Sequence, residues 1–98
     1  MDEPPVKARA VLDIVEKIPA GSVMSYGDVA ALAGLRSPRY VGHVLTRFGD
    51  GVPWHRVVMS DGSFAPHLAV EQVELLRAEA TPLTRDSRRI DMTRARLT

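Results

Sequence analysis

Residues 25–38 read Ser-Tyr-Gly-Asp-Val-Ala-Ala-Leu-Ala-Gly-Leu-Arg-Ser-Pro, and this stretch decides the fold that we expect. Ser25 is typical of a helix N-cap, and Asp28 lies three positions later, where a carboxylate can bond back to the cap. Gly34 supplies the left-handed residue that ends helices, and Ser37 followed by Pro38 is typical of a new helix start. Two short helices, over about residues 26–33 and 38–48, joined by such a turn predict a helix-turn-helix.

The flanking sequence predicts two further helices around this pair. Apolar side chains recur at helical spacing over residues 6–17, and a second amphipathic pattern covers residues 68–80. Between them, residues 23–24 and 54–59 are typical of extended chain, and Asp61-Gly62 is typical of a turn. Residues 83–97 fit a small hairpin, a wing or a frayed tail. We therefore expect a mainly α fold with a small β element, a winged helix-turn-helix.

The length of 98 residues predicts a single domain over residues 1–98. Apolar residues make up 45% of the chain, which is enough for a core, and no run of about 18 apolar residues suggests a membrane span. The acidic, proline-rich start lacks the basic-then-apolar order of a secretory signal. We therefore expect a cytoplasmic protein with no membrane partner.

Positive charge is gathered into two stretches, although the net charge is only +1. Residues 35–56 carry a net +3 and residues 85–98 also carry +3, and most of the cations are Arg. Arg binds phosphate through two hydrogen bonds and stacks on bases, so localised positive charge suits a nucleic-acid partner. A solvated surface explains the charge pattern equally well.

Signals for an enzyme or a metal site are weak. The chain has no Cys, which excludes disulfides, thiolate zinc sites and a Cys nucleophile from it. His43, His55 and His67 are spaced twelve residues apart, which is not a usual metal-ligand spacing. No Gly-rich phosphate loop and no nucleophile-elbow motif is present. We expect no metal, no cofactor and no catalytic residue.

The segment Pro53-Trp54-His55-Arg56-Val57 is the most informative one for function. Taken alone, Trp54 is a natural core anchor for a small domain. The segment also closely resembles the Pro-Cys-His-Arg-Val signature of the O6-alkylguanine-DNA alkyltransferases, with Trp54 in place of the acceptor Cys. Similar matches follow the order of that family from about residue 6 to residue 80: Ile18-Pro19-Ala20-Gly21, Ser25 to Ala30, Arg39-Tyr40-Val41-Gly42 and Leu75 to Glu79.

On these motifs the chain is identified as a member of the non-catalytic, alkyltransferase-like branch of the family, with residues 81–98 as a C-terminal extension. The resemblance implies a winged helix-turn-helix like the C-terminal domain of DNA alkyltransferases, which approaches DNA through the minor groove. This chain departs from the family at Phe48, where Asn is usual, and in the lid, where Phe64 to His67 replace a Gly-Tyr-rich segment.

The resemblance also assigns residue roles. It implies that Tyr26 crowds the phosphate beside the target nucleotide, that Arg39 fills the gap left by an extruded base, and that His55 and Glu79 form a pair. We interpret that pair as a structural hydrogen bond, because no thiol is left to activate. Tyr26 as a packing residue and Arg39 as a solvated Arg stay open alternatives. The expected lesion pocket comprises Tyr26, Trp54, His55, Arg56, Val57 and His67, and the expected DNA-binding set comprises Tyr26, Arg36, Ser37, Arg39 and Tyr40.

Alkyl transfer in the family needs a thiolate, and an indole has no comparable ionisable group. We therefore expect binding without turnover. The resemblance implies flipping of O6-alkylguanine in double-stranded DNA, hand-over to nucleotide excision repair proteins, obstruction of active alkyltransferases, a monomer, and nucleoid association if the source is bacterial. A sequence-specific transcription regulator, or a hydrolase that uses His55, remain the alternatives.

Overall fold

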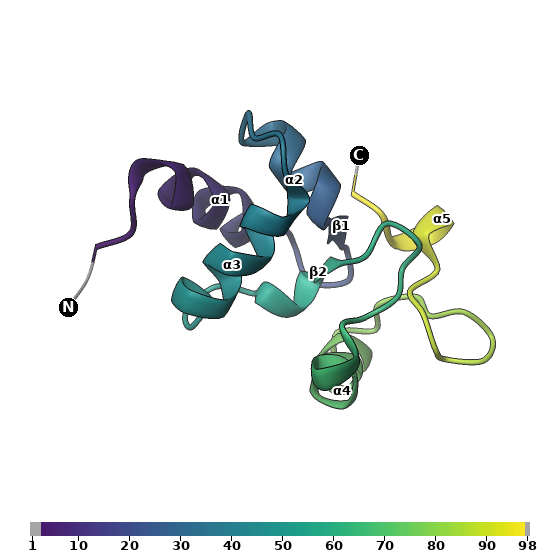
Figure 1. Cartoon of the computed structure of the whole chain (residues 1–98). Helices are drawn as coiled ribbons and strands as arrows, with labels where there is room; N and C mark the ends of the chain where they lie inside the picture. Colours follow the sequence, from purple (N-terminus) through teal and green to yellow (C-terminus); the bar gives the residue numbers. More distant parts are fainter. Residues whose placement is uncertain (1–2, 98) are drawn as a thin grey trace.

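The structure is a computed structural model that describes residues 3–97, so the ends of the domain expected over residues 1–98 lie outside it. Figure 1 shows α1, α2 and α3 packed together on one side, α4 and the C-terminal segment on the other, and two short strands between them. The elements, in chain order, are α1 (Val6–Glu16), β1 (Met24–Ser25), α2 (Tyr26–Leu32), α3 (Pro38–Phe48), the 3-10 helix η1 (Trp54–Arg56), β2 (Val57–Val58), the 3-10 helix η2 (Pro66–Leu68), α4 (Ala69–Ala78) and α5 (Met92–Ala95).

The predicted helix pair is confirmed, and so are the side chains that cap it. The amide of Asp28 donates to Ser25 Oγ over 3.0 Å, and the amide of Ser25 donates to a carboxylate oxygen of Asp28 over 3.2 Å. Gly34 has φ +72° after the end of α2, and Ser37 caps α3 through the amide of Arg39. Each cap satisfies a backbone donor that the first turn of a helix leaves free.

The three N-terminal helices bury a core made largely of valine. It includes residues from each of them, and Val57 of β2 joins the same cluster. Fully burying a Val stabilises a fold by roughly 1.5–3 kcal/mol, so this cluster holds the helix-turn-helix against α1. The buried members are Ala8, Val11, Leu12, Val15, Ile18, Met24, Val29, Ala30, Val41, Val44 and Val57.

The small β element is a parallel pair, in which Met24 lies opposite Val57 and Ser25 opposite Val58. Because the pair is parallel, η1 ends directly before Val57 at one end of it, and α2 begins directly after Ser25 at the other end. Because parallel strands need a crossover, the helix pair itself forms the connection from β1 to β2. The strands therefore link the chain that leads into Tyr26 with the chain that follows Trp54, His55 and Arg56.

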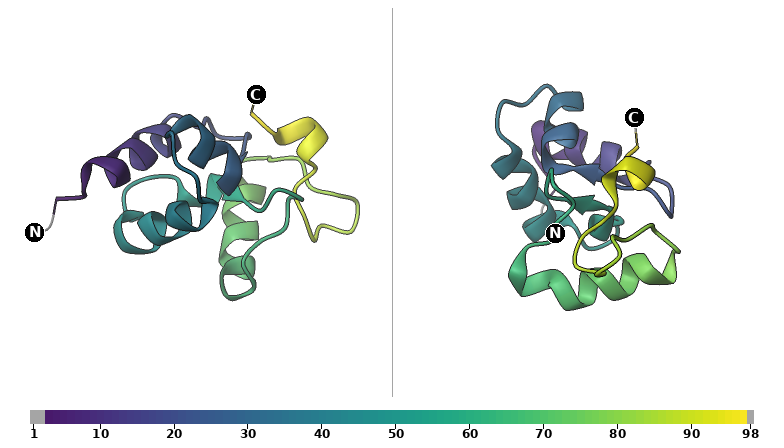
Figure 2. Two further views of the ribbon diagram at one scale, coloured as in Figure 1. Left: turned by 45° about the horizontal axis from the view of Figure 1, so that its top comes forward. Right: turned by 90° about the vertical axis from the view of Figure 1, so that its right-hand side faces the viewer.

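The C-terminal segment packs against the rest of the fold. Leu83 and Ile90 form an antiparallel bridge, closed by a hydrogen bond of 2.8 Å from the amide of Thr84 to the carbonyl of Arg89, as a small hairpin requires. The chain then forms α5 and returns to pair with Val23, a course that Figure 2 follows. A second buried cluster results, made of Val23, Val58, Leu76, Ile90 and Ala95, with Phe64, Leu83 and Met92 packed against it.

The prediction of extended chain over residues 54–59 is wrong for its first half. Residues 54–56 form η1, because the amide of Arg56 donates to the carbonyl of Pro53 over 3.0 Å, and only Val57 and Val58 are strand. The helix predicted from residue 68 begins at Ala69, after η2, and ends at Ala78. Within residues 3–97, no helix has the length and apolar character needed to cross a membrane.

Candidate functional site

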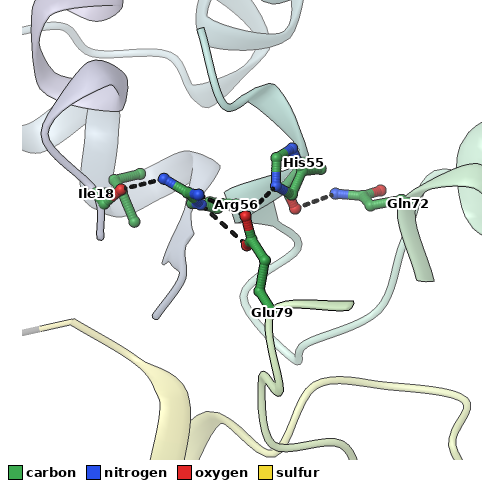
Figure 3. A network of polar contacts seen from close by, with 5 residues as sticks. All are labelled: Ile18, His55, Arg56, Gln72 and Glu79. Atoms are coloured by element: carbon green, nitrogen blue, oxygen red, sulfur yellow. Dashed lines mark hydrogen bonds and ion pairs between the residues drawn. The ribbon is translucent and has the colours of Figure 1, made fainter. Parts of the chain in front are cut away.

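One carboxylate, that of Glu79 at the end of α4, gathers the polar side chains of η1 (Figure 3). Arg56 Nε donates to one of its oxygens over 3.0 Å, and Arg56 Nη2 donates to the other. His55 Nε2 lies 3.1 Å from that second oxygen. Arg56 Nη1 also donates to the carbonyl of Ile18 over 2.7 Å. Arg56 therefore connects η1 to the end of α4 and to the chain just after α1.

The network shifts the pKa values of Glu79 and Arg56 so that both groups stay charged. A hydrogen bond from Arg56 lowers the pKa of Glu79, and the bond to Glu79 in turn raises the pKa of Arg56. The side chains of His55, Arg56 and Glu79 are 13%, 17% and 18% exposed, so water weakens these contacts only in part. Charge-assisted hydrogen bonds of this kind are the strong ones in proteins. The carboxylate thus acts as an anchor that holds η1 in place.

Gln72 is a second anchor for η1, and the sequence analysis missed it. It is 2% exposed, and its amide nitrogen donates to the carbonyl of His55 over 3.0 Å and to that of Val57 over 2.8 Å. Figure 3 shows Gln72 approaching His55 from the side away from Arg56. Its place one helical turn before the buried Leu76 was the available signal, because a polar residue on a buried helix face needs a partner.

Trp54 opens η1 and is half-buried. It is not among the residues that pack against either hydrophobic cluster. Its ring meets the ring of His55 edge to face, with centroids 6.0 Å apart and an angle of 87° between the planes. An indole that anchors a core is surrounded by apolar side chains. The core-anchor alternative for Trp54 therefore finds no support in this packing.

Tyr26 is the first residue of α2 and is also half-buried. A Cβ atom on Gly42 of α3 would lie 3.9 Å from Tyr26 Cε1, so the two helices meet at this pair. Burial raises the pKa of the Tyr26 phenol, which keeps the hydroxyl protonated at neutral pH. Tyr26 can therefore donate a hydrogen bond to an anion while its ring rests against α3.

The start of α3 presents polar residues to solvent. Arg36, Ser37 and Arg39 are exposed, whereas Tyr40 is partly buried against the helical core. A shallow groove of about 370 Å³ is lined by Lys7, Tyr40 and residues 34–37. A wider groove of about 930 Å³ lies on the other side of Tyr40, between the N-terminal segment and α3. The exposed Arg36 and Arg39 therefore form a cationic edge at the turn of the helix pair.

The expected lesion-pocket residues occupy different positions. Trp54, His55 and Arg56 follow one another in η1 directly before β2, whereas Tyr26 follows β1 at the other end of the parallel pair. Val57 is fully buried, so it supports the segment from below and offers no surface to a ligand. His67 is exposed in η2 and takes part in none of the polar contacts around Glu79. Neither groove described above is lined by Trp54 or His55.

Comparisons with known proteins agree with one another. The family model described as "6-O-methylguanine DNA methyltransferase, DNA binding domain" matches residues 7–81. The DNA base-flipping protein of Escherichia coli is 45% identical over 92 residues, which cover 88% of this chain and 70% of that protein.

Solved structures show the same fold. The chain resembles the ATL of S. pombe in complex with DNA, with a TM-score of 0.82, 27% identity, and coverage of 93% of this chain and 94% of that one. It also resembles S. pombe Atl1 in complex with damaged DNA containing O6-carboxymethylguanine, with a TM-score of 0.85, 24% identity and 99% of both chains covered. The second likeness reaches beyond the family match to include the C-terminal segment.

Proposed function

The chain belongs to the family of the 6-O-methylguanine DNA methyltransferase DNA-binding domain, and from that premise we propose that it recognises O6-alkylated guanine in double-stranded DNA without removing the alkyl group. The proposal has three parts: extrusion of the modified base, its capture beside η1, and the absence of chemistry once it is captured. Each part has its own support in the residues described above.

The single observation that carries the proposal is the position of Trp54. The Pro53-Trp54-His55-Arg56-Val57 segment resembles the family's Pro-Cys-His-Arg-Val signature, which implies that Trp54 takes the place of the acceptor thiol, and the sequence contains no Cys. A thiolate is the nucleophile in alkyl transfer, and an indole N–H can only donate a hydrogen bond. Because Trp54 packs against neither core cluster, its ring is available to stack on an extruded base.

Extrusion is assigned to Arg39 and Tyr26. Taking a base out of the stack costs a few kcal/mol, and a side chain must occupy the gap. Arg39 is exposed in the first turn of α3 and has the length and planarity to do so. Tyr26 is held against Gly42 with a protonated hydroxyl, which suits contact with the neighbouring phosphate. The name of the E. coli relative, a DNA base-flipping protein, supports the same action here.

His55 and Glu79 have a structural part in this proposal. Glu79 already accepts hydrogen bonds from Arg56 through both oxygens, and its lowered pKa keeps it ionised. Its contact with His55 then orients the imidazole at the edge of Trp54. The pair forms one wall of the lesion site, and no proton transfer is required of it.

Holding the lesion has a consequence for repair. A lesion kept in the site is shielded from any active alkyltransferase, so the protein competes with such enzymes for the same target. We propose that the bound complex is passed to nucleotide excision repair proteins, and that one monomer binds each lesion. The support for this last part is the family resemblance alone.

The absence of turnover is tested by incubating the protein with a duplex that contains one O6-methylguanine, followed by mass spectrometry of both components. We expect the protein mass to stay unchanged and the modified base to be recovered quantitatively from the DNA. A protein heavier by one methyl group, or conversion of the lesion to guanine, would refute the proposal and favour the enzyme alternative.

A further inference from the structure

The last residues of the described chain lie beside the start of α2, although the family match ends at residue 81. The amide of Val23 donates to the carbonyl of Ala95 over 3.0 Å, and the amide of Leu97 donates to the carbonyl of Val23 over 2.8 Å. In Figure 2 the C-terminal segment returns from α5 toward β1 and α2. The segment thus pairs with Val23, directly before β1 and three positions before Tyr26 opens α2.

Arg96, at the end of this segment, binds Asp28 through two hydrogen bonds. Nε donates to one carboxylate oxygen over 2.9 Å and Nη2 donates to the other over 2.6 Å. The side chains are 51% and 20% exposed. A two-point contact between a planar guanidinium and a carboxylate fixes the orientation of both groups, which a single-point ion pair does not.

Asp28 is also the residue that completes the cap of α2. The oxygen that accepts from Arg96 Nε accepts from the amide of Ser25 as well, over 3.2 Å. Ser25 is 4% exposed and is followed directly by Tyr26. One carboxylate therefore joins the C-terminal segment to the backbone that carries Tyr26. The guanidinium of Arg96 holds the pKa of Asp28 below its ordinary value, so this joint stays ionised at neutral pH.

We propose that Arg96 is a positioning residue that orients Tyr26 for base extrusion by fixing the Asp28 carboxylate. The inference rests on the proposed function, because it gives Tyr26 its role. Helix α2 has only seven residues, so its first turn depends strongly on its cap. An ion pair this exposed contributes little to overall stability, because water screens it. Loss of Arg96 therefore changes the orientation of the Tyr26 side chain far more than it changes the free energy of unfolding.

The test compares Arg96→Ala and Asp28→Asn with a matched control, Arg94→Ala. Arg94 is exposed on the same segment, and its side chain makes no described contact, so its removal changes the charge equally. The DNA is a duplex with one O6-methylguanine next to 2-aminopurine, whose fluorescence rises when the neighbouring base leaves the stack. Affinity for this duplex and for its unmodified counterpart is measured at several salt concentrations.

We expect Arg96→Ala and Asp28→Asn to lower the lesion preference about fivefold or more and to reduce the 2-aminopurine signal, which corresponds to roughly 1 kcal/mol of lost discrimination. Arg94→Ala retains both, and Arg96→Lys, with a one-point contact, is intermediate. Equal behaviour of Arg96→Ala and Arg94→Ala overturns the inference. An equal loss of affinity for both duplexes also overturns it, if the slope of log affinity against log salt concentration becomes shallower by about 0.9. That result would make Arg96 a phosphate contact.

A second readout separates this inference from the proposed function. Nuclear Overhauser effects between the Tyr26 ring and the Cα protons of Gly42 report the ring position without DNA. They weaken in Arg96→Ala and persist in Arg94→Ala if Arg96 positions Tyr26, and they stay equal in both if it does not. A wild-type protein with no lesion preference refutes the proposed function, whereas these spectra still decide the role of Arg96.

Discussion

Glu79 lies 3.1 Å from His55 across 24 positions of the chain, measured from Oε2 to Nε2. The same carboxylate accepts two hydrogen bonds from Arg56, so the end of α4 and the segment that carries Trp54 are joined as one unit. The arrangement allows the protein to hold Trp54 at a defined place without burying it in the core.

Replacing Glu79 with Gln removes the anion that Arg56 and His55 share. A hydrogen bond to a charged group stabilises a fold by about 1.5–3 kcal/mol. We therefore expect the substitution to lower the free energy of unfolding by about 2 kcal/mol. Urea denaturation measures the change. Glu74→Gln is the control, because Glu74 is exposed on the same helix. A loss no greater than that of the control would show that Glu79 does not anchor η1.

The lowered pKa values of Glu79 and Asp28 predict a loss of stability at acidic pH. Their ordinary values are 4.5 and 3.8, and the folded values lie lower, so each carboxylate stabilises the fold fully above its unfolded pKa. That contribution is lost as the pH falls through the folded values. We expect the free energy of unfolding, measured by urea denaturation at a series of pH values, to fall as the pH drops below these ordinary values, and to fall less steeply in Glu79→Gln. Parallel slopes for the two proteins would contradict this assignment.

Trp54 is the sole tryptophan, so its fluorescence reports on the proposed site without any label. Stacking on a base quenches indole emission, and we expect stronger quenching by an O6-methylguanine duplex than by the plain duplex at equal saturation. Trp54→Ala should lower the preference for the lesion, because base–aromatic stacking contributes about 1–3 kcal/mol, while affinity for plain DNA changes little. Equal quenching by both duplexes would argue that Trp54 does not meet the modified base.

Arg39→Ala tests the residue assigned to the vacated space in the duplex. We expect affinity for the lesion duplex to fall about tenfold or more, corresponding to at least about 1.4 kcal/mol. Arg9→Ala is the matched control, because Arg9 is exposed on α1 with only a 3.9 Å pairing to Asp13. Fluorescence anisotropy of labelled duplexes gives both affinities. Similar losses for the two variants would reduce Arg39 to a contributor of general positive charge.

The helix pair could be predicted from sequence because local chemistry specifies it. Ser25 with Asp28, and Ser37 with Arg39, each form hydrogen bonds within three positions, and the left-handed Gly34 lies between them. The contact between His55 and Glu79 spans 24 positions and followed only from the resemblance to the alkyltransferases. Capping contacts form between neighbouring residues and can be predicted from the sequence. Contacts between distant positions can be identified only from the folded structure or from a related protein.

The parts that the sequence did not predict depend on distant partners. Residues 54–56 have no pattern that separates an extended chain from one turn of 3-10 helix, and the bonds from Gln72 to the carbonyls of His55 and Val57 hold the observed form. The pair of Arg96 and Asp28 joins positions 68 apart, and neither residue signals the other. The sequence of residues 83–97 therefore fits a hairpin, a wing or a frayed tail alike, and the burial of Ile90 and Ala95 in the second cluster distinguishes them.

The central claim is that the protein reads the alkyl group itself. Its most direct test is the ratio of dissociation constants for one duplex with O6-methylguanine and the same duplex with guanine, at one salt concentration and in several flanking sequences. The account predicts binding at least about tenfold tighter to the modified duplex in every flanking sequence. Equal affinity for the two duplexes, or a preference that follows the flanking sequence instead of the alkyl group, would contradict it and favour a sequence-specific regulator.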